Sequence, residues 1–372
     1  MTTPRPVVLY GASGSTGRLV AEYLREFGVP FVAAGRNKAR IQDAMDRVPG
    51  IETADYEIAE VDHSVDALAS LFEGRKVVCN VVGPFMRYAK PVVEAARRAG
   101  LHYLDTAGEQ AHQLWLLDEA GPQFAQDGLV ISPAMSVQYA VHDILSRIVL
   151  ETPGIDTLEC FSYANAVPTV GSTQSIFDVI RAQAYHLQDG AMQLWPGVVP
   201  QQMTVPGSGK VVTGTNWGGT AMPVFFRDDG RVRNCAMYVA MQNQAIWKSM
   251  VELERLFKVS LQWLPEDRLY PLLDKLSTSL TAASPPRENR HMHRSVDWVM
   301  GRGNTATARA VLYCSTGYQT TGLLQAYAAK RLLGTEYSGV GFRSPAQLLG
   351  HRELLSALES YGFARLVEDP SA

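Results

Sequence analysis

The stretch Val7-Val8-Leu9-Tyr10-Gly11-Ala12-Ser13-Gly14-Ser15-Thr16-Gly17-Arg18 joins a short apolar run to a segment with helical spacing. The apolar run predicts a strand that ends at Gly11, where the chain must turn tightly. Gly14 lets the backbone approach a diphosphate, and Gly17 lets the helix pack closely on the strand. The helix N-terminus then offers N–H groups and the positive end of its dipole to an anion. Hydroxyl side chains can add further donors: Ser13, Ser15 and Thr16.

These glycines are spaced three-then-three, whereas the commoner dinucleotide-binding fingerprint is two-then-three. Glycines also serve ordinary turns, so the triplet alone is weak evidence for a ligand. Here, however, it follows a strand-like run, opens a helix-like segment and stands at the head of an alternating region. This context predicts that the loop binds the diphosphate of a dinucleotide.

The N-terminal part of the chain alternates between buried strand-like runs and segments with helical spacing. Strands are expected at 7–10, 31–34, 58–61, 77–82, 102–104 and 129–132. Helices are expected at 17–27, around Ile41 and Met45, and at 91–99, where Gly100 ends the helix. Such alternation implies right-handed crossovers and therefore an α/β fold with a doubly wound parallel sheet, a Rossmann domain, which we place at 1–148.

The next part of the chain has the pattern of an α+β domain with an antiparallel sheet. We expect a strand at 157–165, a helix capped by Ser172 or Thr173 that runs to about Leu187, and a loop at 195–223. Two hairpins are expected, 224–227 with 232–241 and 293–300 with 307–315. Helices are expected at 245–257 and 266–280, followed by a linker-like break at 284–287. We place this substrate or dimerisation domain at 149–317. The remaining segment, 318–372, is expected to form helices at 321–333 and 347–361 that return to the Rossmann domain.

The end of the second strand predicts which dinucleotide is bound. Sites for NAD usually place an Asp or Glu there to hold the ribose 2′-hydroxyl. This chain has no acid there and instead has Arg36, a planar cation suited to a 2′-phosphate, followed by Asn37. The sequence therefore favours NADP(H), with Lys38 or Arg40 as helpers. The alternative is a solvated arginine at the start of a helix.

Further candidates follow from the rule that ligands of such sheets lie at the carboxyl ends of the strands. Asp62 follows the third strand and is placed to meet the adenine end. Asn80, Gly83 and Pro84 end the fourth strand, where the central ribose and the nicotinamide would pass. A helix cap for Asp62 and an ordinary turn at Gly83-Pro84 remain equally good alternatives.

Bulk properties exclude several classes of protein. The chain has 372 residues, 46% of them hydrophobic, and a formal net charge of −3, so it lacks the basic field that nucleic acid requires. No run of eighteen apolar residues predicts a transmembrane helix, and no targeting signal stands at the N-terminus, so we expect a cytoplasmic protein. The scattered cysteines form no metal-binding pair and are expected to be buried reduced thiols: Cys79, Cys160, Cys235 and Cys314.

Two further stretches resemble a known family. Residues 81–85 lead through Tyr88 into 91–96 and then into Ala99-Gly100-Leu101-His102-Tyr103-Leu104-Asp105-Thr106-Ala107-Gly108-Glu109. Near the C-terminus, Gly317-Tyr318-Gln319-Thr320-Thr321 precedes a helix and then Ser338-Gly339-Val340-Gly341-Phe342. Both are similar to the saccharopine dehydrogenase-like NADP-dependent reductases, which include trans-acting enoyl reductases. The resemblance covers most of the Rossmann domain and the tail, and only thinly the middle.

The resemblance implies an NADP-dependent oxidoreductase with an inserted α+β substrate domain and C-terminal helices that pack back on the first domain. The chain departs from the family after the sixth strand, where a Gly-Phe-Asp with a nearby Pro-Ser-Asp is common. Residues 133–143 read differently here, and only Asp143 matches. We therefore expect a substrate that differs from those of the better-known members.

A reductase needs a group that gives or accepts a proton near the nicotinamide. Tyr139, His142 and Tyr163 follow strands that lead toward the expected cleft, and the first two are three residues apart at the start of a probable helix. For each of them alone, a buried structural role is the plainer alternative. No metal site is expected, because His291 and His293 have no further ligand at metal spacing.

The middle region contains aromatic residues that can line an apolar pocket, form a core or make a homodimer interface: Trp195, Trp217, Phe225, Phe226, Tyr238, Trp247 and Trp263. We expect NADPH-dependent reduction of a C=C, C=N or C=O bond in a small, largely apolar substrate, with an enoyl-type reduction foremost. Two alternatives stay open. One is a non-catalytic NADP(H) sensor or scaffold, and the other is an amino-acid dehydrogenase, for which no basic carboxylate-binding cluster is evident.

Overall fold

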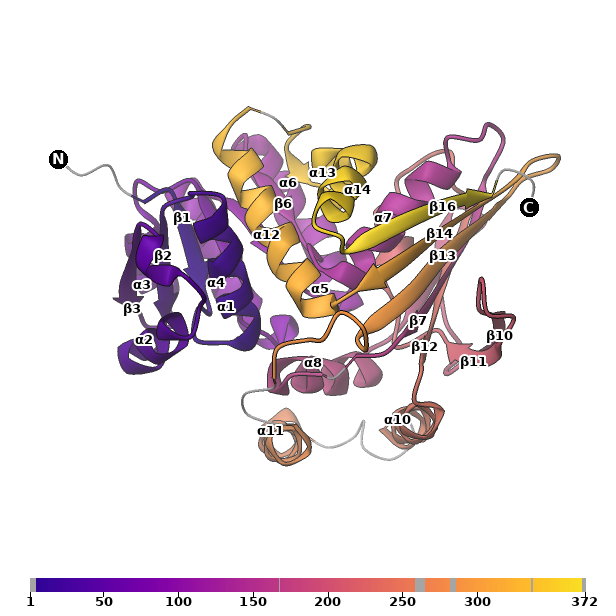
Figure 1. Ribbon diagram of the computed structural model, residues 1–372, viewed down its shortest axis with the longest axis horizontal. Helices are drawn as coiled ribbons and strands as arrows, with labels where there is room; N and C mark the ends of the chain where they lie inside the picture. Colours follow the sequence, from indigo (N-terminus) through magenta and orange to yellow (C-terminus); the bar gives the residue numbers. More distant parts are fainter. Residues whose placement is uncertain (1–4, 167, 258–264, 282–285, 336, 370–372) are drawn as a thin grey trace. The chain divides into compact units, whose positions relative to one another are not determined.

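The computed structural model describes residues 5–166, 168–257, 265–281, 286–335 and 337–369 (Figure 1). It divides into two compact units. Unit 1 comprises Met1–Ala107, His112–Val137 and Tyr318–Gly350, and unit 2 comprises Gly108–Ala111, Gln138–Gly317 and His351–Ala372. The predicted limits at 148 and 317 differ from this division, and the predicted break at 284–287 lies partly outside the described residues.

Unit 1 contains a parallel sheet in the order β15-β6-β5-β4-β1-β2-β3. Its strands are β1 (Val7–Tyr10), β2 (Phe31–Gly35), β3 (Tyr56–Glu60), β4 (Val77–Asn80), β5 (His102–Asp105), β6 (Val130–Ser132) and β15 (Gly341–Phe342). Every residue of β1, β2 and β4 is buried, as expected for strands that are covered on both faces. The predicted doubly wound Rossmann sheet is confirmed, and its strand order reverses between β1 and β4.

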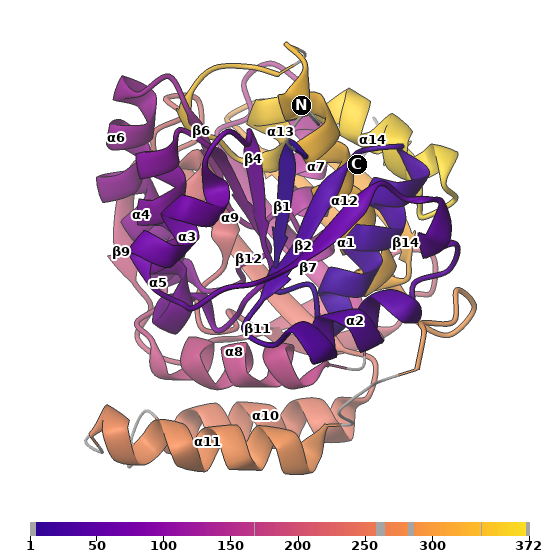
Figure 2. The ribbon, with the colours of Figure 1, turned by 90° about the vertical axis from the view of Figure 1, so that its left-hand side faces the viewer.

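Helices cover both faces of this sheet (Figure 2). Helices α3 (Val65–Phe72) and α4 (Phe85–Ala99) lie on one face, and α1 (Ser15–Glu26) and α12 (Gly317–Leu333) lie on the other. Gly322 brings α12 close to α1, because a Cβ there would lie 2.8 Å from the backbone of Leu19. Gly100 ends α4 in the left-handed conformation, as predicted. Unit 1 also contains, in part or whole, η1 (Ile51–Thr53), α2 (Lys38–Asp46), α5 (Gln110–Trp115), the π-helical η2 (Leu116–Ala120), α6 (Gly121–Gln126) and α13 (Pro345–Leu349).

Unit 2 is built on a mixed sheet in the order β10-β11-β12-β7-β13-β14-β16. Its strands are β7 (Thr157–Ala164), β8 (Tyr185–Gln188), β9 (Ala191–Leu194), β10 (Pro200–Thr204), β11 (Val211–Thr215), β12 (Asn234–Met241), β13 (Arg294–Arg302), β14 (Thr307–Ser315) and β16 (Ala364–Asp369). Its helices are α7 (Val137–Val149), α8 (Val170–Arg181), α9 (Ala221–Phe226), α10 (Gln244–Leu256), α11 (Glu266–Leu280) and α14 (His351–Ser360). The predicted α+β architecture is confirmed, and so is the hairpin that β13 and β14 form.

Several predictions within unit 2 are wrong. Residues 195–223 are not loop, since they contain β10, β11 and the start of α9. The hairpin predicted around 228–230 is absent, because its first arm is the end of α9, and β12 pairs in parallel with β7. An apolar run as short as Val224–Phe226 has no periodicity that separates helix from strand. Helix α8 is capped by Thr169 and ends at Arg181, before the predicted limits.

The C-terminal segment contributes to both units. Strand β15 pairs with β6 in unit 1, whereas α14 and β16 belong to unit 2 because β16 pairs with β14. The predicted helix at 347–361 is divided by Gly350 into α13 and α14, and β16 was not predicted. The expectation that all of 318–372 returns to the Rossmann domain therefore applies only up to Gly350.

The aromatic residues of the middle region are mostly buried. Phe161, Tyr238 and Trp298 stack on one face of the unit 2 sheet, with ring centroids 5.1 to 5.8 Å apart. Trp217, Phe225, Phe226 and Trp247 are buried as well, and Trp263 lies outside the described residues. The four cysteines, all within the described ranges, are buried and unpaired, as predicted. Among the described helices, none combines the length and the apolar character needed to cross a bilayer.

Candidate functional site

The glycine loop adopts the geometry that its sequence predicts. Gly11 has φ +96°, a conformation that disfavours side chains, and a Cβ there would lie 2.8 Å from Val82. A Cβ at Gly17 would lie 2.5 Å from the Gly11 carbonyl oxygen and 2.8 Å from the Ala12 Cα. Gly14 is exposed, and its N–H donates to the Gly11 carbonyl at 3.0 Å. The loop is thus closed on its inner side and open at Gly14.

The N-terminus of α1 carries no side-chain cap. Its N-cap residue is Gly14, whereas α2, α3, α8 and α13 are capped by Asn, Ser or Thr side chains. The first N–H groups of a helix have no partner inside the helix. Ser15, Thr16 and Gly17 occupy this first turn of α1, and the exposed Ser13 precedes it. The turn therefore suits an anion such as a diphosphate.

Helix α4 begins in the same way at the end of β4. Its N-cap is Pro84, which also offers no side-chain cap, and Gly83 precedes it. Helices α1 and α4 lie on opposite faces of the sheet and follow the adjacent strands β1 and β4. In doubly wound sheets the ligand crevice lies where the strand order reverses in this way. The predicted residues Gly11, Gly14, Gly17, Gly83 and Pro84 are thus brought to one edge of unit 1.

The end of β2 presents a cation. Arg36 is exposed immediately after β2. Asn37 caps α2, since its Oδ1 accepts a hydrogen bond from the Arg40 N–H at 2.9 Å. One acceptor of the Asn37 side chain is therefore already engaged within the protein. The Glu60 carboxylate, at the end of β3, accepts from the Lys38 N–H at 2.6 Å and thus lies at the N-terminus of α2.

A tyrosine–histidine pair beside Arg36 was missed in the sequence. The Tyr10 hydroxyl lies 2.8 Å from His63 Nδ1, and these two rings stack with centroids 5.9 Å apart. The rings of Tyr88 and His63 are nearly perpendicular, with centroids 5.8 Å apart. Burial raises the pKa of Tyr10 to about 12, and the charge of Arg36 opposes this. Burial lowers the pKa of His63, Arg36 lowers it further, and the Tyr88 backbone raises it. His63 Nε2 is buried and makes no hydrogen bond to any described residue.

Asp62 and Asn80 have different surroundings. Asp62 is exposed after β3, and the alternative reading as a helix cap does not apply, because Ser64 caps α3. Asn80 is fully buried. Its Nδ2 donates to the Tyr103 hydroxyl at 3.0 Å, and its Oδ1 accepts from the Val82 N–H at 3.1 Å. Asn80 therefore shapes the chain after β4 rather than presenting its side chain to solvent.

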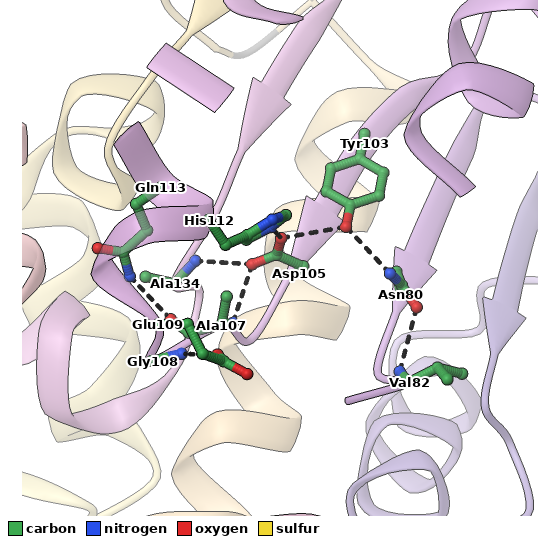
Figure 3. A network of polar contacts seen from close by, with 10 residues as sticks. All are labelled: Asn80, Val82, Tyr103, Asp105, Ala107, Gly108, Glu109, His112, Gln113 and Ala134. Carbon is green, nitrogen blue, oxygen red and sulfur yellow. Dashed lines mark hydrogen bonds and ion pairs between the residues drawn. The ribbon is translucent and has the colours of Figure 1, made fainter. Parts of the chain in front are cut away.

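Asn80 belongs to a buried polar network that the sequence did not reveal (Figure 3). Its centre is Asp105, the last residue of β5, which is fully buried. Asp105 Oδ1 accepts from the N–H groups of Ala107 and Ala134 at 2.9 and 3.0 Å. Its Oδ2 accepts from the Tyr103 hydroxyl at 3.1 Å and lies 2.8 Å from His112 Nε2. The network joins the carboxyl ends of β4 and β5. An aspartate at the carboxyl end of a buried strand is the signal that could have indicated it.

Two predicted proton donors, Tyr139 and His142, lie on α7 in unit 2. The Tyr139 hydroxyl donates to the Gly108 carbonyl at 3.2 Å, and burial, aided by the Glu109 carboxylate, raises the pKa of Tyr139 above its usual value. His142 is fully buried, with Nδ1 against the Gln138 carbonyl and Nε2 3.0 Å from the Phe161 carbonyl. Neither nitrogen of His142 is left for a substrate, so its contacts indicate a role in fixing α7 on β7.

Tyr163 does not join His142. Ser162 Oγ donates to Asp297 Oδ1, and this oxygen lies 3.8 Å from His142 Nε2. Because neighbouring side chains of a strand point to opposite faces, Tyr163 lies on the other face of the sheet, in the aromatic cluster. Its hydroxyl accepts from Lys210 Nζ at 2.9 Å.

Comparisons with known proteins identify both parts of the chain. Residues 140–371 match a family of unknown function, DUF5938, and residues 7–131 match the saccharopine dehydrogenase NADP binding domain. The solved structure of apo saccharopine dehydrogenase (L-Glu forming) from Saccharomyces cerevisiae aligns with a TM-score of 0.59 over 98% of this chain and 99% of that chain. The identity is 11%, so this likeness concerns the fold, and it confirms the predicted fold class.

Two curated relatives share part of the sequence. A putative trans-acting enoyl reductase of Mycobacterium tuberculosis is 33% identical over 147 residues, which are 38% of this chain and 35% of that protein. A trans-acting enoyl reductase of Mycobacterium leprae is 36% identical over 106 residues, 28% of this chain and 25% of that protein. The chain therefore matches about a third or less of the length of these relatives.

The matches confirm the resemblance seen in the sequence and its cofactor. The uncapped α1 N-terminus behind the glycine loop and the exposed Arg36 fit a dinucleotide that carries a 2′-phosphate, and NADP(H) is the cofactor of the matched domain. The chain belongs to the DUF5938 family and carries, at residues 7–131, the NADP-binding domain of the saccharopine dehydrogenase-like oxidoreductases.

Proposed function

We propose that this protein is an NADPH-dependent reductase of a C=C, C=N or C=O bond in a small, largely apolar substrate, with a conjugated C=C bond as the first candidate. The observation that carries the proposal is the glycine loop at the uncapped N-terminus of α1, together with Arg36 after β2. The bound cofactor would supply the hydride, and the chain would orient the substrate and manage the proton. The preference for C=C rests on the relatives named enoyl reductases.

An apolar substrate is supported by two indole rings of unit 2. Trp217 and Trp247 pack with ring centroids 5.0 Å apart, and both are buried. Trp217 has φ +40°, a strained conformation for a non-glycine residue, and such strain is common at functional sites. Trp247 Nε1 is buried without a hydrogen-bond partner among the described residues, so it can donate to an oxygen of a ligand.

Single-turnover mixing tests the proposal. The full-length protein is loaded with NADPH and mixed with an enoyl thioester, a cyclic imine or a ketone, while the absorbance of the reduced nicotinamide is followed. We expect oxidation with the enoyl thioester at a rate well above that of the protein-free control. NADH in place of NADPH is the matched control and should react less at equal concentration. Cofactor binding without oxidation by any of the three would leave the sensor or scaffold function and the amino-acid dehydrogenase as the remaining functions.

A second candidate is an amino-acid dehydrogenase of the saccharopine dehydrogenase type, which the family of the NADP-binding domain favours. It predicts the opposite direction, with NADP⁺ reduced on addition of saccharopine. The same instrument distinguishes the two, because absorbance would rise with saccharopine and fall with the enoyl thioester.

A further inference from the structure

The buried Asp105–His112 pair has a fixed direction of hydrogen bonding. An ionised carboxylate accepts hydrogen bonds and does not donate them, with about four accepting positions. Asp105 receives two backbone N–H groups on Oδ1 and the Tyr103 hydroxyl on Oδ2. The Tyr103 oxygen in turn accepts from Asn80 Nδ2, so its own proton points to Asp105. The remaining contact, at 2.8 Å, therefore requires His112 Nε2 to donate.

This direction determines the state of the other ring nitrogen. A neutral imidazole with its hydrogen on Nε2 carries a lone pair on Nδ1, and that nitrogen can gain and release a proton. No described residue forms a hydrogen bond to His112 Nδ1. The ring is held by Phe85 and Trp115, with centroids 5.8 and 5.9 Å away. His112 is thus oriented through Nε2, and Nδ1 is not used by any described residue, in a side chain that is 2% exposed.

The position of the pair in unit 1 indicates what that ligand is. Strands β4, β5 and β6 form the second mononucleotide-binding half of the doubly wound sheet, the half that receives the nicotinamide. Asp105 ends β5, and the network continues through Asn80 to the Val82 N–H, at the turn before α4. Phe85, which packs on His112, is the first residue of α4. The dyad therefore lies at the carboxyl edge of that half.

We propose that His112 is the catalytic acid–base of this protein and that Asp105 is the positioning residue that fixes its tautomer; the proposal rests on the proposed reductase function. The substrate double bond gains two electrons and one hydrogen as the hydride that NADPH supplies, and NADPH is oxidised to NADP⁺. The second hydrogen comes as a proton from His112 Nδ1, and His112 is left neutral. It regains a proton from solvent before the next turnover.

Other titratable groups surround the ring. Asp105 and Tyr103 face it from β5, Glu109 lies three residues earlier in the chain, and the Lys90 ammonium on α4 lies over Trp115, 5.1 Å from its centroid. An experiment on protonation must therefore isolate His112 from these groups and from the adenosine half of the site, where His63 and the 2′-phosphate also titrate.

The ratio of the dissociation constants of NADP⁺ and NADPH isolates the contribution of His112. NADP⁺ and NADPH share the adenosine half and differ in charge at the nicotinamide, which is positive only when oxidised. A protonated His112 repels the oxidised ring, so the dissociation constant of NADP⁺ divided by that of NADPH should rise as pH falls. We expect a rise of roughly tenfold or more between pH about 8 and pH about 5, because the positive charge that His112 gains lies in a buried site, where water screens it little. Calorimetric titration of the full-length protein measures both constants.

Substitutions test whether the pH dependence of this ratio comes from His112. H112Q retains an amide that can donate to Asp105 but cannot titrate, so the ratio should no longer change with pH; H112N serves if H112Q does not fold. H102Q is the matched control, because His102 is a half-buried histidine at the amino end of the same strand β5. H102Q should keep the wild-type slope.

The outcomes separate this inference from the function on which it rests. If neither dinucleotide binds, the reductase function is refuted and His112 loses its role with it. If both bind but the wild-type ratio is independent of pH, or H112Q keeps the wild-type slope, only the assignment of His112 is overturned. The wild-type measurement alone can give this negative result, so the test does not depend on the folding of any variant.

Discussion

At the scale of single residues, we propose that the Arg36 side chain determines the preference for NADP(H) over NAD(H). It is exposed directly after β2, and its first neighbours in sequence are Asn37 and Lys38 rather than an acid. R36E replaces a cation by an anion beside the expected 2′-phosphate. We expect the affinity for NADPH to fall roughly 10- to 100-fold, since charge-assisted hydrogen bonds contribute about 1.5–3 kcal/mol. Calorimetric titration with NADPH and NADH measures the effect, and the affinity for NADH should change little.

R40E is the matched control for this substitution. Arg40 is also exposed but lies within α2, and its backbone N–H rather than its side chain is bonded to the Asn37 cap. Its charge reversal should reduce NADPH affinity much less than that of Arg36. Equal losses for both variants would mean that the general field of this surface, and not a contact of Arg36, attracts the phosphate.

His63 should make the stability of the protein depend on pH. Its folded pKa is lowered, so between about pH 6.5 and the lower folded pKa the unfolded chain binds more protons than the folded one. Stability therefore falls as pH decreases through this window. Urea unfolding at pH about 7.5 and pH about 5 should show a smaller loss for H63Q than for the wild type. A loss of equal size in both proteins would show that His63 keeps an ordinary pKa.

Residues with local requirements could be assigned from the sequence, whereas residues joined by tertiary contacts could not. Gly11 and Gly17 were identified because the turn and the close packing that need glycine lie within the same short motif. His112 reaches Asp105 through a turn without periodicity, so no pattern links the two. His142 was a reasonable candidate by position. Its use of both ring nitrogens on backbone carbonyls became visible only with the α7–β7 packing.

At the scale of elements, substitutions of two glycines at the start of α1 should affect the stability of the fold and the binding of NADPH to different degrees. G17A places a methyl group 2.5 Å from the Gly11 carbonyl oxygen, and backbone cannot move aside as a flexible side chain can. We expect a loss of about 1–3 kcal/mol in the free energy of unfolding, measured with urea. G14A meets only the Gly11 oxygen, at 3.3 Å, and should cost much less stability while weakening NADPH binding. If G14A binds NADPH as tightly as the wild type does, the open side of the loop is not where the diphosphate lies.

Elements with strong burial patterns were predictable, and exposed elements were not. Strands β1, β2 and β4 are buried throughout and read as continuous apolar runs. Strand β10 is mostly exposed at the edge of its sheet, so its sequence carries neither alternation nor an apolar run. The parallel pairing of β12 with β7 was not predicted, because the residues at the end of the short helix α9 were interpreted as the first arm of a hairpin with β12.

At the scale of the whole molecule, the two units are interleaved in sequence. The chain forms most of unit 1, then unit 2, then returns to unit 1 with α12 and β15, and ends in unit 2 with β16. The sequence indicated an inserted domain but assigned the whole tail to the Rossmann part. The exchange at Gly350 escaped prediction because helices α13 and α14 read as one continuous segment.

Strands β15 and β16 come late in the chain, and this order has a consequence for biosynthesis. While the ribosome is still translating the residues before 341, the β6 and β14 edges have no partner on their outer side. Bare strand edges recruit strands from other polypeptides. We therefore expect the nascent chain to require binding by chaperones until translation has passed residue 369. We also expect nascent chains to aggregate with one another when elongation stalls shortly before that residue.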